Sequence, residues 1–436
     1  MGTTVEGALN RAGTGRFQYR LLGIFGLVWA ADAMQVLSVG FTAPGIAAEF
    51  GLEVREALQT GTLFFLGMMV GAYGFGRLAD RVGRRQVLLI TVALDGVFGL
   101  LSAFSPDFTM LLACRFLTGA AVGGTLPVDY ALMAEFLPTR QRGKWLVALE
   151  GFWAVGTVAI ALAAWALSAY GVEHAWRWLF VFTAMPAVIG IWLRFWVPES
   201  PLFLLRQGRS TEAVGVLNRV LRINRKPPLE ELQLQDAREA AIPLGLMSSP
   251  LRRRTVLILA TWFFISLSYY GAFVWLPARL AGEGFGFVRG YGFLVIVALA
   301  QIPGYILAAY GVEQIGRRPT LIAFTLLSAA GCFLFAVAST PLMVGAAILV
   351  MSFAMLGSWG ALYAFTPEIY PTTDRATGMG AAGAMARIGG LLAPSLLAPI
   401  MSHSLYSAIG AFSILLVFAA VAAWFIDVET RQKALA

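Results

Sequence analysis

The chain has little charge for its length and almost no cysteine or histidine. Only 13% of its 436 residues are Asp, Glu, Lys or Arg, and 58% are hydrophobic, whereas about 25% of the residues of a soluble domain are charged. Two cysteines and two histidines exclude a disulfide framework and a Cys/His metal site. The polar segments also contain no phosphate-binding loop and no nucleophile triad. We therefore predict no enzyme, no cofactor and no metal.

Long apolar runs are what the sequence has instead. Runs of about 20 residues, enough to cross a hydrocarbon core of about 30 Å, recur along the whole chain. The first six predicted spans are 20–44, 58–78, 86–105, 107–134, 144–169 and 176–197. The second six are 255–279, 290–312, 319–339, 341–366, 377–401 and 404–427. Twelve is an even number, so both termini lie on one side of the membrane.

The polar segments divide the chain into five parts. We predict an N-terminal segment at 1–19, a six-helix bundle at 20–197, a linker with short surface helices at 198–254, a second bundle at 255–427 and a tail at 428–436. The linker is too short for a sizeable core of its own. It therefore joins two bundles and is not a third domain.

Basic residues gather on the side of the termini. All but six of the 32 Lys and Arg residues lie there or in segments on the same side. The exceptions are Arg55, Arg177, Arg279 and Arg289 on the other side and Arg115 and Arg387 inside spans. Because Lys and Arg accumulate in cytoplasmic loops, we predict a multi-pass protein of the cell membrane with both termini in the cytoplasm. The net charge of +8 follows from this bias and gives no support to a nucleic-acid partner.

A constant offset of 233 residues relates the two halves. GRLADRVGRRQ at 76–86 returns as AYGVEQIGRRP at 309–319, and EFLPTRQR at 135–142 returns as EIYPTTDR at 368–375. The same offset aligns Trp29 with Trp262 and Gly156 with Gly389. Paired helical repeats around a shared midplane site are typical of secondary transporters.

The repeated motifs predict a gate on the cytoplasmic side. Their glycines permit tight turns and close approach, and their charged side chains can bind one another or helix ends. Such ion pairs would hold the halves together when the site faces outward and break when it faces inward. The predicted gate residues are Gly76, Asp80, Gly83, Arg84, Arg85, Glu135, Arg142, Arg317, Glu368 and Arg375.

Small residues three or four positions apart predict where helices pack closely. They are Gly67, Gly71 and Gly74 in the second span and Gly119 and Gly123 in the fourth. Without a Cβ, these positions let two backbones approach in the lipid phase.

These motifs resemble those of the major facilitator superfamily. The string at 76–86 resembles its signature, RFLTGAAVGG at 115–124 resembles its second motif, and PESPLFLL at 198–205 and VETRQKAL at 428–435 are similar to its sugar-porter-like branch. WAADAMQ at 29–35, LEGFWAVGTV at 149–158 and ARIGGLLAP at 386–394 resemble the synaptic-vesicle-protein-like group, whose bacterial members include niacin and organic-acid carriers. The resemblance implies an all-α membrane protein of two pseudo-symmetric six-helix bundles. The short loop between spans 7 and 8 departs from the vesicle glycoproteins, so a synaptic role is not implied.

Ionisable residues inside a span are functional candidates, because each costs several kcal/mol to bury there. Asp32 lies roughly 18 Å from the cytoplasmic side and Arg115 roughly 12 Å from the outer side, depths that coincide in a core of about 30 Å. We predict that they pair and carry the transported proton. A static pair that only fixes helix packing is the alternative, and Asp95 is a second candidate for the proton.

Arg387 lies about 15 Å deep, near the midplane, where an anionic substrate could supply its missing counter-charge. Aromatic rings in spans 5, 7 and 10 could form a flat slot; Tyr269 and Trp359 belong to this group. The predicted substrate-binding residues are Arg387, Trp153, Tyr270, Trp275, Gln35, Gln301, Tyr363 and Glu150. Glu150 is either a ligand or the partner of Arg387.

We expect proton-coupled symport of a small organic anion, an aromatic or heterocyclic monocarboxylate such as nicotinate, by alternating access. The expected partners are this substrate, H⁺ and the lipid bilayer, and we expect a monomer. The alternatives are a sugar or polyol:proton symporter and a transport-inactive ligand-binding membrane protein.

Overall fold

The computed structural model describes residues 4–229, 245–280, 291–401 and 405–433, and within these ranges its regular structure is helical. The first half contains α2 (Arg16–Phe50), α4 (Gln59–Val82), α5 (Arg84–Ala103), α6 (Phe108–Glu135), α7 (Arg142–Glu150), α8 (Phe152–Ala169) and α9 (Ala175–Arg194). The second half contains α13 (Ser249–Leu280), α14 (Tyr291–Gln314), α15 (Arg317–Ala336), α16 (Pro341–Phe365), α17 (Arg375–Met401) and α18 (Leu405–Trp424). These helices cover all twelve predicted spans, and ten candidate membrane spans are found among the described residues.

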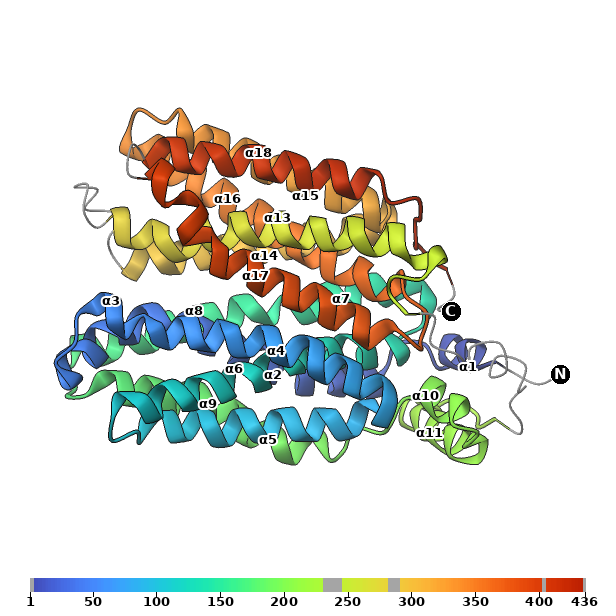
Figure 1. The fold of residues 1–436 in the computed structure, drawn as a ribbon. Coiled ribbons are helices and arrows are strands. Elements are labelled where there is room, and N and C mark those ends of the chain that lie inside the picture. Colours follow the sequence, from blue (N-terminus) through green and yellow to red (C-terminus); the bar gives the residue numbers. More distant parts are fainter. Residues whose placement is uncertain (1–3, 230–244, 281–290, 402–404, 434–436) are drawn as a thin grey trace.

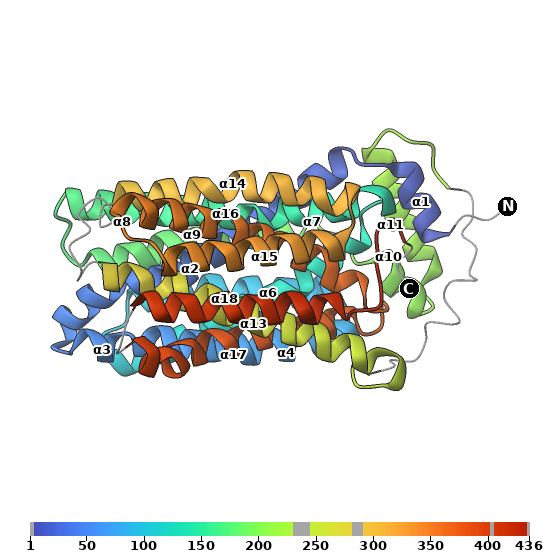
Figure 2. The same ribbon diagram turned by 90° about the horizontal axis from the view of Figure 1, so that it is seen from above.

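The helices form two bundles that lie against each other (Figure 1), with α4 of the first half beside α17 of the second. Both termini lie at one end, called the terminal end below, and α1 (Val5–Ala12), α10 (Pro201–Arg206) and α11 (Ser210–Ile223) project beyond the long helices there (Figure 2). Short elements complete the described chain: α3 (Val54–Ala57), η1 (Thr139–Gln141) and η2 (Thr366–Glu368). The twelve-helix, two-bundle prediction is confirmed. The fifth span differs from it in one detail, since α7 and α8 meet at Gly151.

Equivalent residues start equivalent helices in the two halves. The Asp107 side chain accepts a hydrogen bond from the Met110 N–H at the start of α6, and Thr340, 233 positions later, does the same for the Met343 N–H at the start of α16. Each satisfies one of the amides that a helix N-terminus leaves without a partner. The repeat in the sequence is therefore a repeat of local structure.

The starts of α5 and α15 use a second shared device. Gly83 and Gly316 have φ of 113° and 127°, a region that side chains disfavour. The Glu199 carboxylate accepts from the Arg84 and Arg85 amides at 3.1 Å each, and Glu429 accepts from the Arg317 and Arg318 amides at 3.0 Å each. Burial raises the pKa of the Glu199 carboxyl above its ordinary value. Sequence analysis missed both glutamates as helix caps, although they lie in PESPLFLL and VETRQKAL.

Glycine determines the contact of α4 with α6. A Cβ at Gly67 would lie 2.0 Å from the Phe116 carbonyl oxygen, and one at Gly119 would lie 2.0 Å from that of Phe64. Gly71 and Gly123 are equally close to the opposite backbone. The prediction is wrong for Gly74, where a Cβ would meet nothing within 4 Å, because that position points away from α6.

Candidate functional site

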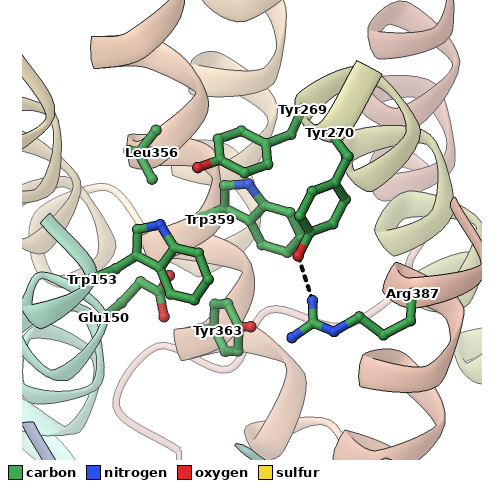
Figure 3. A pocket seen from close by; sticks show the side chains of 8 residues that line it. All are labelled: Glu150, Trp153, Tyr269, Tyr270, Leu356, Trp359, Tyr363 and Arg387. Carbon is green, nitrogen blue, oxygen red and sulfur yellow. Dashed lines mark hydrogen bonds between the residues drawn. The ribbon is translucent and has the colours of Figure 1, made fainter. Parts of the chain in front are cut away.

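A cavity lies between the two halves, inside the bundle. Its volume is about 10 Å³, room for about one water molecule, so the lining side chains lie close together and must separate to admit a ligand. The first half contributes Glu150 from α7 and Trp153 from α8. The second half contributes the remaining lining residues, which are Tyr269, Tyr270, Leu356, Trp359, Tyr363 and Arg387. Figure 3 shows Glu150 and Arg387 on opposite sides of this cavity.

A cluster of aromatic rings from both repeats packs beside this cavity. Tyr130 and Tyr363, which are equivalent in the repeat, have ring centroids 4.6 Å apart. Trp29 and Trp262, also equivalent, contact Tyr363 at 5.6 Å and 4.8 Å. These tilted and edge-on contacts are the favourable arrangements of aromatic pairs, and they support Tyr363, the one ring of this group that lines the cavity.

Arg387 is the cationic group of the cavity. Its side chain is buried, its Nη1 donates to the Tyr270 hydroxyl at 2.5 Å, and its guanidinium lies 5.9 Å from the centre of the Tyr270 ring. Its buried Nε has no hydrogen-bond partner among the residues that the structure describes. A buried donor without an acceptor is costly, and an anionic ligand would supply that acceptor.

Glu150 is the acidic group of the cavity and is 3% exposed. Its Oε2 accepts from the Tyr130 hydroxyl at 2.6 Å, and its Oε1 accepts from the Tyr305 hydroxyl at 3.4 Å. Tyr130 belongs to the first half and Tyr305 to α14 of the second. The carboxyl group of Glu150 thus joins the halves through neutral donors.

Arg115 binds Gln35, and not Asp32 as its depth in the membrane predicted. Its Nη1 donates to Gln35 Oε1 at 2.8 Å and its Nη2 to the Gln35 carbonyl at 3.3 Å, while Gln35 Nε2 donates to Asp95 Oδ1 at 3.5 Å. The guanidinium also lies between the rings of Phe64 and Phe180, at 4.5 Å and 4.6 Å. Depth along a helix fixes the height of a residue but not the direction of its side chain. Asp32 is buried in α2, and its role in proton coupling stays a prediction.

Ion pairs at the terminal end join the halves. Arg375 of α17 pairs with Glu135 of α6 at 2.7 Å, and Arg84 pairs with Asp80 at 2.9 Å and Glu135 at 3.5 Å. Arg84 Nη2 also donates to the Thr372 carbonyl at 2.7 Å. All of these guanidinium groups are buried.

The first turn of α17 is bound by the first half as well. Asp80 accepts from both the backbone N–H and the hydroxyl of Thr377, at 2.7 Å each. A carboxylate is favourable at a helix N-terminus, where amides and the helix dipole carry positive charge. We call the contacts of Asp80, Arg84, Glu135, Arg375 and Thr377 the latch.

The second repeat forms a related cluster with fewer contacts across the halves. Arg317 pairs with Glu368 at 3.0 Å and with Glu313 at 3.5 Å, and Glu313 accepts from the Lys144 amide of the first half at 3.0 Å. Arg142 pairs with Glu6 of α1 at 3.3 Å and donates to the Lys433 carbonyl at 3.3 Å. Sequence analysis missed Glu6 and Glu313; the 233-residue offset from Asp80 could have revealed Glu313.

The remaining predicted gate residues lie near the latch. Gly76 faces α17, where a Cβ would lie 2.5 Å from the Ala376 carbonyl oxygen. Arg85 instead stays within the first half, donating to the Val197 carbonyl at 2.9 Å and the Phe195 carbonyl at 3.5 Å.

Five predicted substrate residues line the cavity: Glu150, Trp153, Tyr270, Tyr363 and Arg387. Gln35 is used by Arg115 and Asp95, and Gln301 is buried in α14; the described lining includes neither. The side chain of Trp275 lies outside the described residues. Sequence analysis missed Leu356. It also missed Tyr130 and Tyr305, because in the sequence alone they cannot be told from lipid-facing rings of an apolar span.

Known proteins resemble this chain over almost its whole length. The family model for sugar (and other) transporters matches residues 42–436. A niacin transporter of Acinetobacter baylyi is 34% identical, covering 97% of this chain and 96% of its own, and a putative niacin/nicotinamide transporter of Bacillus subtilis is 33% identical, covering 96% and 98%. A synaptic vesicle 2-related protein of Xenopus laevis is 32% identical, covering 99% and 82%.

Solved structures share the fold. A proton:xylose symporter of the major facilitator superfamily has a TM-score of 0.80 at 20% identity and covers 96% of this chain and 97% of its own. A human organic anion transporter has a TM-score of 0.67 at 17% identity, covering 94% and 100%.

Proposed function

The chain belongs to the sugar (and other) transporter family of the major facilitator superfamily, and from this premise we propose that it is a symporter of protons and a small organic anion. The substrate is an aromatic or heterocyclic monocarboxylate such as nicotinate. The protein works by alternating access in the cell membrane, as a monomer with the terminal end in the cytoplasm.

The environment of Arg387 is the main observation in support of an anionic substrate. This guanidinium is buried in the cavity, and its Nε has no acceptor among the described residues. The planar fork of an arginine matches a carboxylate, and hydrogen bonds between charged groups are about twice as strong as those between neutral ones. A carboxylate bound here would replace a missing acceptor and neutralise a buried charge.

The aromatic lining of the cavity supports a substrate with a planar ring, which would enter as the lining side chains separate. Five of the side chains that line it are aromatic, namely Trp153, Tyr269, Tyr270, Trp359 and Tyr363. Stacking on such a ring contributes about 0.5–1.5 kcal/mol beyond the burial of area. The two bacterial relatives, named as a niacin transporter and a putative niacin/nicotinamide transporter, match 97% and 96% of this chain, which supports nicotinate as the first substrate to test.

The latch supports alternating access. It closes the terminal end through contacts between the halves, while the cavity lies between the same halves. Inward opening requires the latch to break. Packed interfaces of buried ion pairs and hydrogen bonds are either formed or broken, so the latch would have one closed and one open state.

Uptake of labelled nicotinate into proteoliposomes tests the proposal by competition. We expect excess unlabelled benzoate to compete and excess xylose to have no effect, because only benzoate has both a ring and a carboxylate. Competition by xylose alone would instead support the sugar symporter that the family model and the fold also allow. Tight nicotinate binding without exchange of labelled for unlabelled nicotinate would identify a ligand-binding protein that does not transport.

A further inference from the structure

Two opposite charges in the cavity depart from the repeat. The equivalent of Glu150 in the second half is Gly383, and the equivalent of Arg387 in the first half is Ala154. The aromatic rings beside the cavity, in contrast, follow the repeat: Tyr130 is equivalent to Tyr363, and Trp29 is equivalent to Trp262. The shared fold therefore does not require these charges, which points to a function specific to this cavity.

The surroundings of Glu150 suit both of its protonation states. A phenol hydroxyl both donates and accepts, so Tyr130 and Tyr305 can donate to a carboxylate or accept from a carboxylic acid. Four other titratable groups interact electrostatically with Glu150: Tyr269 and Tyr270 of α13, Tyr363 of α16 and Arg387 of α17. The neutral Trp29 of α2 also lies beside it. Among these, Arg387 is the cation, and its hydrogen bond goes to Tyr270.

The sum of charges then couples the proton to the anion. With Glu150 ionised, Glu150 and Arg387 cancel, and an anion would bring net negative charge into a small cavity with little water. With Glu150 protonated, Arg387 leaves one positive charge, which the anion neutralises. By linkage, a proton that strengthens anion binding is itself held more tightly when the anion is bound.

The position of Glu150 also suits release of its proton at the terminal end. It lies eight residues after Arg142 on α7, so roughly 12 Å from the terminal end, between the latch and Trp153. Its hydrogen bond from Tyr305 crosses between the halves. Opening of the terminal end would break this bond and let water reach the carboxyl group, so that its proton can leave to that side.

We propose that Glu150 is the proton-binding residue of the transport cycle, and that its protonation admits an organic anion to Arg387. This inference rests on the proposed function. It differs from the sequence-based prediction, which assigned the proton to Asp32 with Arg115 and gave Glu150 a role in substrate binding.

Calorimetry of nicotinate binding to the purified full chain in nanodiscs tests it. Titrations in two buffers of different ionisation enthalpy give the number of protons taken up with the ligand. We expect the wild type to take up a number of protons per nicotinate that rises with pH toward about one, because only molecules with Glu150 ionised must gain a proton on binding. We expect none at any pH for Glu150→Gln, which mimics the protonated state and still binds. Asp32→Asn is the matched control and should keep the proton uptake of the wild type.

Three results would overturn the inference. Glu150→Gln could bind nicotinate with undiminished proton uptake, or Asp32→Asn could abolish it, and either leaves the proposed function intact. Absence of nicotinate binding to the wild type would remove the proposed function and this inference with it. If Glu150→Gln does not fold, infrared difference spectra of the wild type replace it: nicotinate should produce a protonated carboxyl band that shifts in Tyr130→Phe, and a spectrum without that band contradicts the inference.

Discussion

Replacing Gly76 by alanine should force the terminal end open. A Cβ at Gly76 would lie 2.5 Å from the Ala376 carbonyl oxygen, and one at Gly380 would lie 2.3 Å from the Ala72 carbonyl oxygen, whereas ordinary contact begins at 3.4 Å. Both contacts join α4 to α17 across the halves. The atom in the way is backbone in each case, so a side-chain rotation cannot relieve the overlap.

The size of the effect follows from this overlap. Overpacking of a close-packed contact costs about 1–3 kcal/mol, which corresponds to a shift of about 5- to 150-fold in a two-state equilibrium. In Gly76→Ala this cost falls on the state with the latch closed and is relieved when the halves separate. The opened fraction should rise by that factor.

Hydrogen–deuterium exchange of the first turns of α17 measures the opened fraction. We expect those amides to exchange about 5- to 150-fold faster in Gly76→Ala than in the wild type, and Gly380→Ala should behave alike. Gly74→Ala is the control, since it lies on the same helix and its Cβ meets nothing within 4 Å. Equal exchange in Gly76→Ala and Gly74→Ala would refute the idea that this contact holds the terminal end closed.

Three further predictions concern buried charges. Glu135→Gln should open the latch in the same exchange assay, because removing one partner of a buried pair costs about 3–5 kcal/mol. Glu212→Gln, which removes a pair exposed on both sides, should leave the exchange unchanged, and equal effects of the two variants would contradict this. Arg387→Leu should weaken nicotinate binding by about 10- to 150-fold in calorimetry, because a hydrogen bond to a charged group contributes about 1.5–3 kcal/mol. An unchanged affinity would remove Arg387 from the site. Gln35→Leu should lower the free energy of unfolding by about 1–3 kcal/mol in a denaturation experiment, because the buried Arg115 loses its side-chain acceptor Oε1 and keeps only the backbone carbonyl. Gln301→Leu should cost less, and the reverse order would contradict the assignment.

The fold could be predicted because its signals are local and repeated. Each span is a long apolar run, and the 233-residue offset aligns Gly83 with Gly316 and Glu135 with Glu368. The structure gives both members of each pair the same local role. Glu150 and Arg387 could be predicted because ionisable side chains inside a span are rare and are functional candidates by default. Trp153, Tyr270 and Tyr363 were predicted only as part of a larger aromatic group.

What could not be predicted depends on direction and on partners in the other half. Asp32 and Arg115 have matching depths, but the direction of Arg115 brings it to Gln35. Glu135 and Arg375 lie in different copies of the repeated motif, yet they pair with each other across the halves. Depth and spacing along a helix do not contain this information, because it arises only when two bundles pack together.

Accumulation of labelled nicotinate by proteoliposomes under an imposed pH gradient tests the central claim most directly. With the outside acidic, the account predicts that nicotinate accumulates inside faster and to a higher level than in protein-free liposomes under the same gradient, and that a protonophore collapses this difference. Accumulation equal to that of the protein-free liposomes would contradict proton-coupled transport by this cavity.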